Sequence, residues 1–120
     1  MQVVGAFGHF YCNRKPIRNA RVRLTNNVRI RNQEILDSTL TNKNGYFLVR
    51  GHTYSHYTTL PYLEVSHNCG ERNHNCHRKF KLRIPTYYVF VGTTIHRFYE
   101  ARHIDLRKRY YYRRICMKNA

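Results

Sequence analysis

The sequence predicts an all-β protein, and three observations carry that prediction. Apolar and polar residues alternate with a period of two over 20–25 and 79–84, the pattern of a strand with one buried face. Strand-like segments recur at short spacing, with turn-forming residues between them. Helical periodicity is limited to one weak turn at 32–36. Seven or eight short strands in 120 residues predict a two-sheet sandwich or a barrel.

The expected strands follow one another along the whole chain. They cover residues 3–11, 20–25, 46–50, 62–67, 79–84, 87–91, 95–99 and 109–115. Turn residues separate them at 13–16, 42–45, 68–75 and 85–86. The chain contains no internal repeat, linker or low-complexity segment, so a single domain over 1–120 is expected.

Positive charge dominates the composition. Twenty-two Lys and Arg stand against six Asp and Glu, which gives a formal net charge of +16. Like charges at this density repel one another and destabilise the compact state. An anionic partner is the simplest explanation: lipid headgroups, acidic glycans or, least favoured, nucleic acid. The alternative is a surface that only keeps the protein soluble in a salty extracellular medium.

Four cysteines in a small chain indicate a disulfide framework, which forms in an oxidising compartment. They allow three connectivities. We expect Cys69–Cys76, which would close a hairpin-sized loop, and Cys12–Cys116, which would tie the first strand to the chain end. The strand-like start predicts a mature secreted protein whose signal peptide has been removed. No apolar segment reaches the length of a membrane span.

Seven short segments stand in a characteristic order along the chain. They are GHFYCNRKP (8–16), VRL (22–24), ILD (35–37), TNKNGYF (41–47), LPYLEVSHNC (60–69), CHRK (76–79) and IP (84–85). The match extends from Gly5 to Cys116 and includes both inner cysteines. As an ordered set, these segments resemble the nematode transthyretin-like family, small secreted proteins named for their similarity to transthyretin.

The resemblance implies a transthyretin (prealbumin)-like β-sandwich, secretion and the cysteine pairing given above. It also implies a binding role. Members of the family are associated with phosphatidylserine exposed on dying cells, and parasite members with the host interface. This chain departs from the family pattern at 26–31, where an acidic stretch is usual, and near 102–106, where arginine replaces a glycine. Both changes make the surface more basic than is typical.

We therefore expect an extracellular adaptor or effector that docks on anionic surfaces. Residues two apart on a strand share a face, so 21–23 and 79–83 each form a basic stripe. The stripes form one surface if they adjoin, and stay separate if they lie on opposite faces. The segment 102–114 mixes basic residues with tyrosines, which suits a phosphate-bearing ligand or, alternatively, a strand with tyrosines inward. The candidate anion-binding residues are Arg21, Arg23, Lys79, Lys81, Arg83, Arg107, Lys108, Arg109, Tyr111, Arg113 and Arg114.

Metal binding and catalysis are weaker hypotheses. His67, Cys69, His74, Cys76 and His77 lie within eleven residues, but their spacing fits no common zinc site and disulfides would consume both thiolates. We expect no metal and no other cofactor. The catalytic branch of the transthyretin superfamily, the 5-hydroxyisourate hydrolases, uses a first-strand histidine, for which His9 is the counterpart. Its Tyr-Arg-Gly-Ser tail is replaced here by YRRIC (112–116), so we expect no enzyme.

Two further alternatives remain open. The domain could bind a cell-surface protein, as a host-interaction effector in which charge only steers association. It could instead disrupt anionic membranes. The sequence leaves the oligomeric state undetermined.

Overall fold

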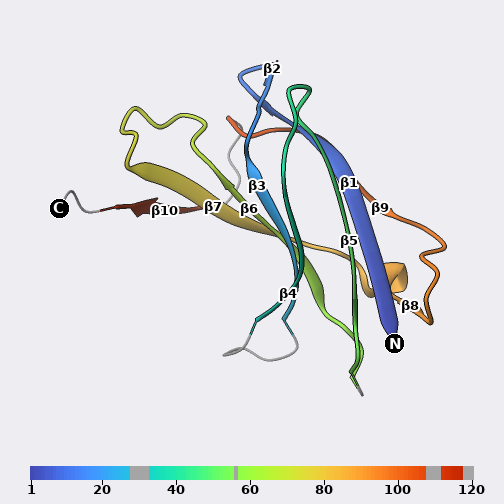
Figure 1. Ribbon diagram of the computed structural model, residues 1–120. Coiled ribbons are helices and arrows are strands. Elements are labelled where there is room, and N and C mark those ends of the chain that lie inside the picture. The colour runs from blue at the N-terminus through green and yellow to red at the C-terminus, as the bar shows by residue number, and fades with distance from the viewer. Residues whose placement is uncertain (28–32, 56, 108–111, 118–120) are drawn as a thin grey trace.

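A computed structural model describes residues 1–27, 33–55, 57–107 and 112–117 and has two β-sheets packed face to face (Figure 1). The elements are β1 (Gln2–Cys12), β2 (Lys15–Pro16), β3 (Arg21–Asn26), β4 (Glu34–Leu40), β5 (Tyr46–Thr53), β6 (Pro61–His67), β7 (Cys76–Arg83), the 3₁₀ turn η1 (Thr86–Tyr88), β8 (Phe90–Val91), β9 (Tyr99–Asp105) and β10 (Arg113–Cys116). The predicted all-β sandwich with two disulfides is confirmed. Within the described ranges, no helix is long and apolar enough to cross a membrane.

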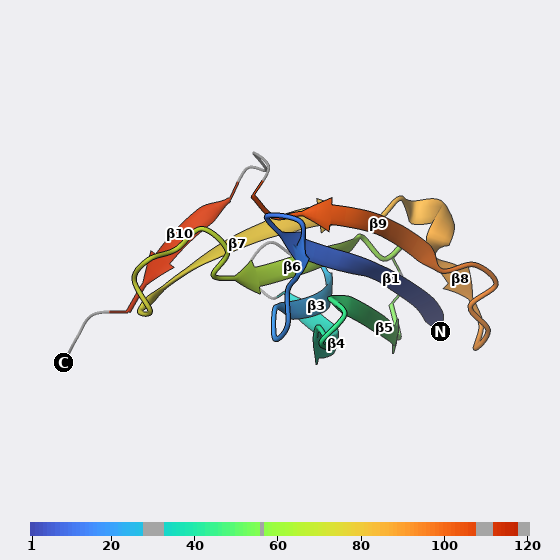
Figure 2. The same ribbon diagram turned by 90° about the horizontal axis from the view of Figure 1, so that it is seen from above.

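The first sheet is built around β1. Strand β5 pairs with it antiparallel, β9 pairs with it in parallel, and β2 and β8 pair with its two ends. The second sheet has the order β10-β7-β6-β3-β4, and all neighbouring pairs are antiparallel. Seen from above, β10 and the adjoining part of β7 extend beyond the body of the sandwich (Figure 2). The second sheet therefore carries a projecting two-stranded arm at one side.

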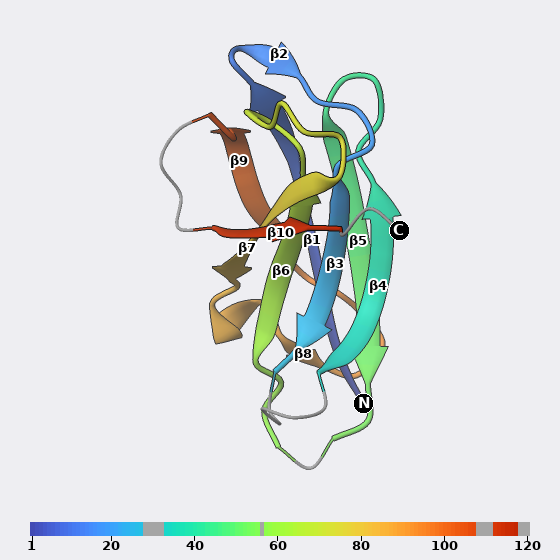
Figure 3. The same ribbon diagram turned by 90° about the vertical axis from the view of Figure 1, so that its left-hand side faces the viewer.

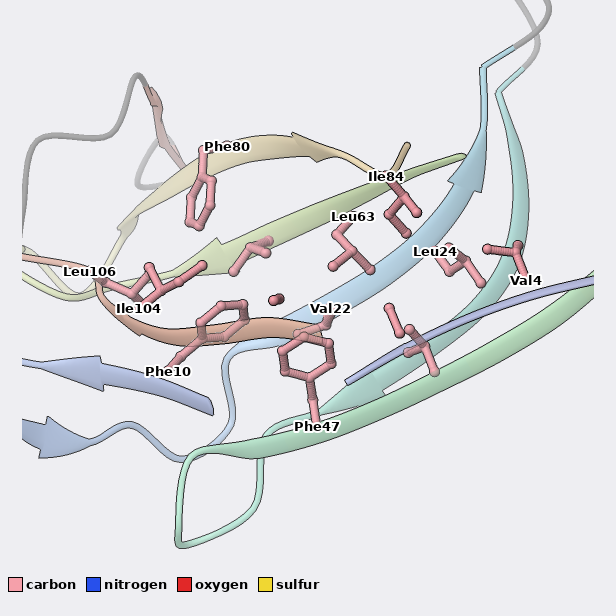
Figure 4. Packing of buried hydrophobic residues seen from close by; sticks show 14 of the residues in the cluster. Val4, Phe10, Val22, Leu24, Phe47, Leu63, Phe80, Ile84, Ile104 and Leu106 are labelled. Carbon is pink, nitrogen blue, oxygen red and sulfur yellow. The ribbon is translucent and has the colours of Figure 1, made fainter. Parts of the chain in front are cut away.

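Strand alternation places the core between the sheets. Val22 and Leu24 of β3 are fully buried, as the period of two requires for one face of a strand. Phe10 of β1 stacks on Phe47 of β5 with ring centroids 4.9 Å apart. Figure 4 shows these rings with Leu63 of β6 between the two layers. Burying each such side chain contributes about 1.5–3 kcal/mol.

A two-residue turn joins β1 to β2. Asn13 and Arg14 have φ values of 52° and 69°, which are the left-handed values that a tight hairpin turn requires. The carboxylate of Asp105, at the end of β9, accepts hydrogen bonds from both backbone N–H groups at 3.1 and 2.9 Å. The turn is thus tied to the end of the neighbouring parallel strand.

Several expected elements differ from those observed. The weak helical turn at 32–36 overlaps β4, an edge strand whose apolar side chains Ile35 and Leu40 are exposed, so its sequence shows no clear alternation. A strand was expected over 87–91, but its first residues belong to the 3₁₀ turn η1 and only Phe90–Val91 forms a strand, β8. No strand spans 95–99 as expected, because 95–98 folds over β1. There the ring of Phe98 occupies the place that a Cβ on residue 5 would fill, so only glycine fits at Gly5.

The last strands also differ from expectation. Strand β9 starts at Tyr99 and continues to Asp105, a segment that the sequence did not identify as a strand. At the C-terminus, β10 covers Arg113–Cys116, whereas residues 109–111 of the expected strand lie outside the described residues.

The predicted disulfide pairing is wrong. The bridges are Cys12–Cys69 and Cys76–Cys116, with Cα atoms 5.7 and 4.0 Å apart. Strand β10 adds to the free edge of β7 and places Cys116 directly opposite Cys76. Cys69, buried after β6, then meets Cys12 at the end of β1. One bridge therefore joins the two sheets, and the other lies within the second sheet.

Digestion with trypsin under non-reducing conditions tests this pairing. Cleavage after Arg72 separates Cys69 from Cys76. We expect peptide 1–14 linked to 51–72, and peptide 73–78 linked to 115–118, as measured by mass spectrometry. A 51–72 peptide linked to 73–78 would contradict the observed topology.

Removing the bridge between the sheets with Cys12→Ala and Cys69→Ala should lower the free energy of unfolding by about 2–5 kcal/mol.

Candidate anion-binding face

The two predicted basic stripes lie on the same face of the second sheet. Ser66 of β6 is in register with Arg21 on β3 and with Lys79 on β7. Directly opposed residues of antiparallel strands share a face, so both stripes flank β6 on its outer side. Figure 3 shows the molecule from this side, with β3, β4 and β6 in front of the first sheet. We define the basic face by Arg21, Arg23, Lys79, Lys81, Arg83 and Arg113.

One acid lies at the centre of this face. Glu64 of β6 is in register with Arg23 and Lys81, and its Oε1 pairs with Lys79 Nζ at 3.1 Å. Gln33 Nε2 donates to its Oε2 at 3.0 Å. Burial raises the pKa of the Glu64 carboxyl, but these hydrogen bonds and the charges of Lys79 and Lys81 outweigh that effect and hold its pKa below the usual value. Glu64 therefore stays ionised and fixes Lys79 on the face.

The C-terminal strand contributes one predicted residue to the basic face and turns another away. Arg113 is opposite Lys79 and shares its face. Arg114 lies on the other side, where its Nη2 pairs with Glu71 Oε1 at 3.0 Å. Glu71 also pairs with Arg78 Nε at 2.9 Å. Hydrogen bonds from Arg114 and then Arg78 lower the pKa of Glu71. Arg114 is therefore engaged within the protein.

The other predicted residues are not brought to this face. Arg107 follows β9 in the first sheet, and its backbone N–H donates to Asp105 Oδ1 at 3.0 Å. Lys108, Arg109 and Tyr111 lie outside the described residues. The neighbouring Tyr112 packs its ring against the guanidinium of Arg78, whose carbon is 4.5 Å from the ring centroid. This contact belongs to the side of β7 that faces away from the basic face.

Two adjoining hollows open on the basic face. The first, of about 280 Å³, is lined by Arg21, Arg23, Ser66, His77 and Lys79. The second, of about 400 Å³, shares Ser66 and His77 and extends between residues 17–20 and 74–76. Sequence reasoning missed Arg18, Ser66, His74 and His77. Alternation along β7 could have placed His77 with Lys79, whereas the others depend on how distant segments meet.

Three members of the histidine and cysteine cluster, His67, Cys69 and Cys76, have structural roles. All four sulfurs are in disulfides, so neither Cys69 nor Cys76 is a thiolate. His67 is buried, and its Nδ1 accepts a hydrogen bond from the Cys69 N–H at 3.0 Å. Burial and the nearby charge of Arg78 lower the pKa of His67 to about 4. No group of three or more potential metal ligands is found in the parts of the chain that the structure describes.

A cluster of histidine and tyrosine side chains lies on the outer face of the first sheet. His9 of β1 stacks on His103 of β9 with ring centroids 5.0 Å apart, and its ring also lies 5.1 Å from that of Tyr46. The hydroxyl of Tyr11 is 3.3 Å from Nδ1 of His103. A second histidine thus accompanies His9. The C-terminal tail, however, pairs with β7 in the opposite sheet.

Comparisons with known proteins agree with this architecture. Residues 7–85 match the model of the transthyretin-like family. Transthyretin-like protein 5 of Caenorhabditis elegans is 34% identical over 106 residues, which cover 88% of this chain and 76% of that protein. Transthyretin-like protein 33 of the same organism is 30% identical over 92 residues, covering 76% of this chain and 64% of that protein.

One solved structure also overlaps this chain. A 9R-lipoxygenase from Cyanothece has a TM-score of 0.47 at 13% identity, covering 87% of this chain and 16% of that one, and this weak likeness supports no argument. The family match covers well over half of the chain. The chain therefore belongs to the transthyretin-like family.

Proposed function

We propose that this protein is a secreted extracellular binding protein, an adaptor or effector, that docks on anionic surfaces through the basic face. The observation that carries the proposal is the strand register, which collects basic residues of β3, β7 and β10 around a single acid. Phosphatidylserine-exposing membranes and acidic glycans both present the required charge. Membership of the transthyretin-like family and two disulfides support an extracellular binding role.

The distribution of the acids strengthens this proposal. Three carboxylates elsewhere are already engaged: Asp37 accepts from the Arg50 N–H at 3.0 Å, Glu34 from the Thr53 hydroxyl at 2.9 Å, and Glu71 pairs with Arg78 and Arg114. On the basic face, only Lys79 pairs with a described acid. Arg21, Arg23 and Arg83 make no ion pair with any of the described acids. Their charges remain available to an external anion.

Binding is also better supported than catalysis. A hydrolase of the superfamily's catalytic type would need the C-terminal tail beside its histidines. Here Arg113 of that tail lies on the basic face and Arg114 pairs with Glu71 in the second sheet, away from His9 on β1. We therefore propose a non-enzymatic role, and we expect no cofactor.

Charge reversal on the basic face tests the docking proposal. Arg21→Glu with Arg83→Glu should lower affinity for heparin and for phosphatidylserine vesicles at least about tenfold, because it removes the charge-assisted contact of Arg21, worth about 1.5–3 kcal/mol, and introduces two repelling charges. Binding of the unchanged protein should fall steeply with added salt, since bound counterions are released. Elution from heparin and vesicle co-sedimentation across a salt series measure both effects.

The matched control is Lys43→Glu with Arg50→Glu. It changes the net charge equally, but both side chains are exposed away from the basic face, in the β4–β5 turn and on β5. We expect a much smaller loss of affinity. Equal losses in both variants would show that only the total charge matters, and salt-independent binding would exclude docking by charge. In either case a protein partner would become the better account.

Replacing the central acid should separate stability from binding. Glu64→Gln removes the ion pair with Lys79 and should lower the free energy of unfolding at pH 7 by about 1–2 kcal/mol. The lowered pKa of Glu64 means that its stabilisation is present above the unfolded-state value near 4 and is lost as pH falls through the folded-state value. The difference from the unchanged protein should therefore shrink at pH 3 in urea denaturation. Heparin affinity at pH 7 should rise, because Lys79 is released.

A direct assay tests the absence of catalysis. We expect 5-hydroxyisourate to decay at the same rate with and without the protein, followed by its ultraviolet absorbance. His9→Ala should leave that rate unchanged. A protein-dependent rate that His9→Ala abolishes would overturn the non-enzymatic proposal.

A further inference from the structure

We propose that the two adjoining hollows form one binding groove for the sulfate groups of a linear acidic polysaccharide. We call it the basic groove and define it by Arg18, Arg21, Arg23, His74, His77 and Lys79 around Ser66. This inference rests on the proposed docking function and names its ligand class. It assigns recognition to one concave part of the basic face, and leaves the flat part, with Lys81 and Arg83, outside the site.

Ser66 forms the floor where the two hollows meet. Its small side chain stands between the long side chains of Arg21 and Lys79, with which it is in register. Because neighbouring strands lie about 4.8 Å apart, the backbones of Arg21 and Lys79 are roughly 10 Å apart. The side chains of Arg21 and Lys79 thus form two cationic rims of a hollow that has the Ser66 hydroxyl at its base. Among the described residues, that hydroxyl makes no hydrogen bond, so it can donate to a ligand oxygen.

The groove continues because of the course of β7 and of its preceding loop. His77 lies two residues before Lys79 and so shares its face. Beyond it, exposed Arg18 and Asn19 form one wall, and His74 and Asn75 form the other. The shared residues Ser66 and His77 make the hollows continuous. Neither hollow is lined by an acid, so a chain carrying repeated anionic groups meets no carboxylate in them. The basic and polar side chains are interrupted by the apolar Ile17, Ala20 and Met117 in the second hollow.

The concave shape favours a chain over a membrane. A flat bilayer would contact the rims of the groove and leave Ser66 untouched. Met117 is exposed beside the second hollow, but the exposed side chains suited to lipid that lie together, Tyr54, Tyr57 and Leu60, are in the β5–β6 connection. Figure 1 shows this connection at the opposite end of the molecule from the β6–β7 loop, which holds His74. One membrane plane would not engage the groove and these residues together.

The lining also favours a polysaccharide over a single-stranded nucleic acid. Proteins that bind single strands combine a positive groove with aromatic rings on which bases stack. Neither hollow is lined by tyrosine or phenylalanine. Arginine guanidinium groups donate paired hydrogen bonds to sulfate oxygens as they do to other planar or tetrahedral oxyanions. Among the residues that line the groove, the rings that could stack on a base are the imidazoles of His67, His74 and His77, and His67 is buried. The groove thus offers mainly charge and hydrogen bonds.

A pair of charge-matched variants locates the site. Arg18→Ala with Arg21→Ala removes two exposed groove charges, and Lys81→Ala with Arg83→Ala removes two exposed charges of the same face outside it. The probe is a size-defined heparin oligosaccharide, measured by isothermal titration calorimetry. We expect the groove pair to weaken binding at least about tenfold, and the flat pair by less than about threefold.

A charge-neutral pair tests shape directly. Ser66→Ile fills the floor with a β-branched side chain that suits a strand. Thr94→Ile introduces the same side chain at an exposed position of the β8–β9 connection, which lines neither hollow. We expect Ser66→Ile to lower heparin affinity severalfold with the net charge unchanged. Thr94→Ile should not alter it. Circular dichroism and thermal unfolding confirm that both variants are folded.

Each outcome bears on the groove and on docking separately. Equal losses from the groove pair and the flat pair, with no effect of Ser66→Ile, would overturn the groove while leaving docking by the basic face intact. Absence of heparin binding in the unchanged protein would overturn the groove, and docking as well if phosphatidylserine vesicles also fail to bind. Tighter binding of those vesicles or of an oligonucleotide, with the same dependence on Arg18 and Arg21, would replace the polysaccharide as the ligand.

Discussion

Antiparallel pairing of β6 with β3 on one side and β7 on the other determines both faces of the second sheet. A shift of either register by one residue would turn every side chain of that strand to the opposite face. The observed register places Val22, Val65 and Phe80 together in the core. The same register places Arg21 and Lys79 on either side of Ser66 outside. Selection for a packed core therefore also maintains the arrangement of the basic groups.

Repulsion among these basic groups is limited by where the acids lie. Glu64 neutralises part of the charge at the centre of the basic face through Lys79. Glu71 holds Arg78 and Arg114 on the opposite side of β7. This second cluster joins β7, β10 and the β6–β7 loop beside the Cys76–Cys116 bridge. The projecting arm is thereby stabilised by an ion-pair network and a disulfide, with little apolar core beneath it.

Local patterns could predict which residues share a face, but not which strands are neighbours. Alternation correctly placed Arg21 on the same face as Arg23, and Lys79 on the same face as Lys81, because residues two apart on one strand always share a face. The addition of β10 to β7 is a contact between distant segments, and it determines the disulfide pairing that was predicted wrongly. Alternation alone places the adjacent Arg113 and Arg114 on opposite faces, but the pairing of β10 with β7 decides which of them shares a face with Lys79. Edge strand β4 was missed because its apolar side chains are exposed.

The arm formed by β7 and β10 links the topology to the proposed specificity. A flat sheet with the same residues would present Arg21, Lys79 and Lys81 as equivalent points of charge. Where β7 leaves the body of the sandwich (Figure 2), Cys76 and His77 lie beyond the part of β7 that pairs with β6, and they line one wall of the second hollow. The disulfide between Cys76 and Cys116 anchors the end of that wall. Because pairing with β10 and a covalent bridge hold this wall, we expect the groove to have its shape before a ligand binds, so that less ordering has to accompany binding.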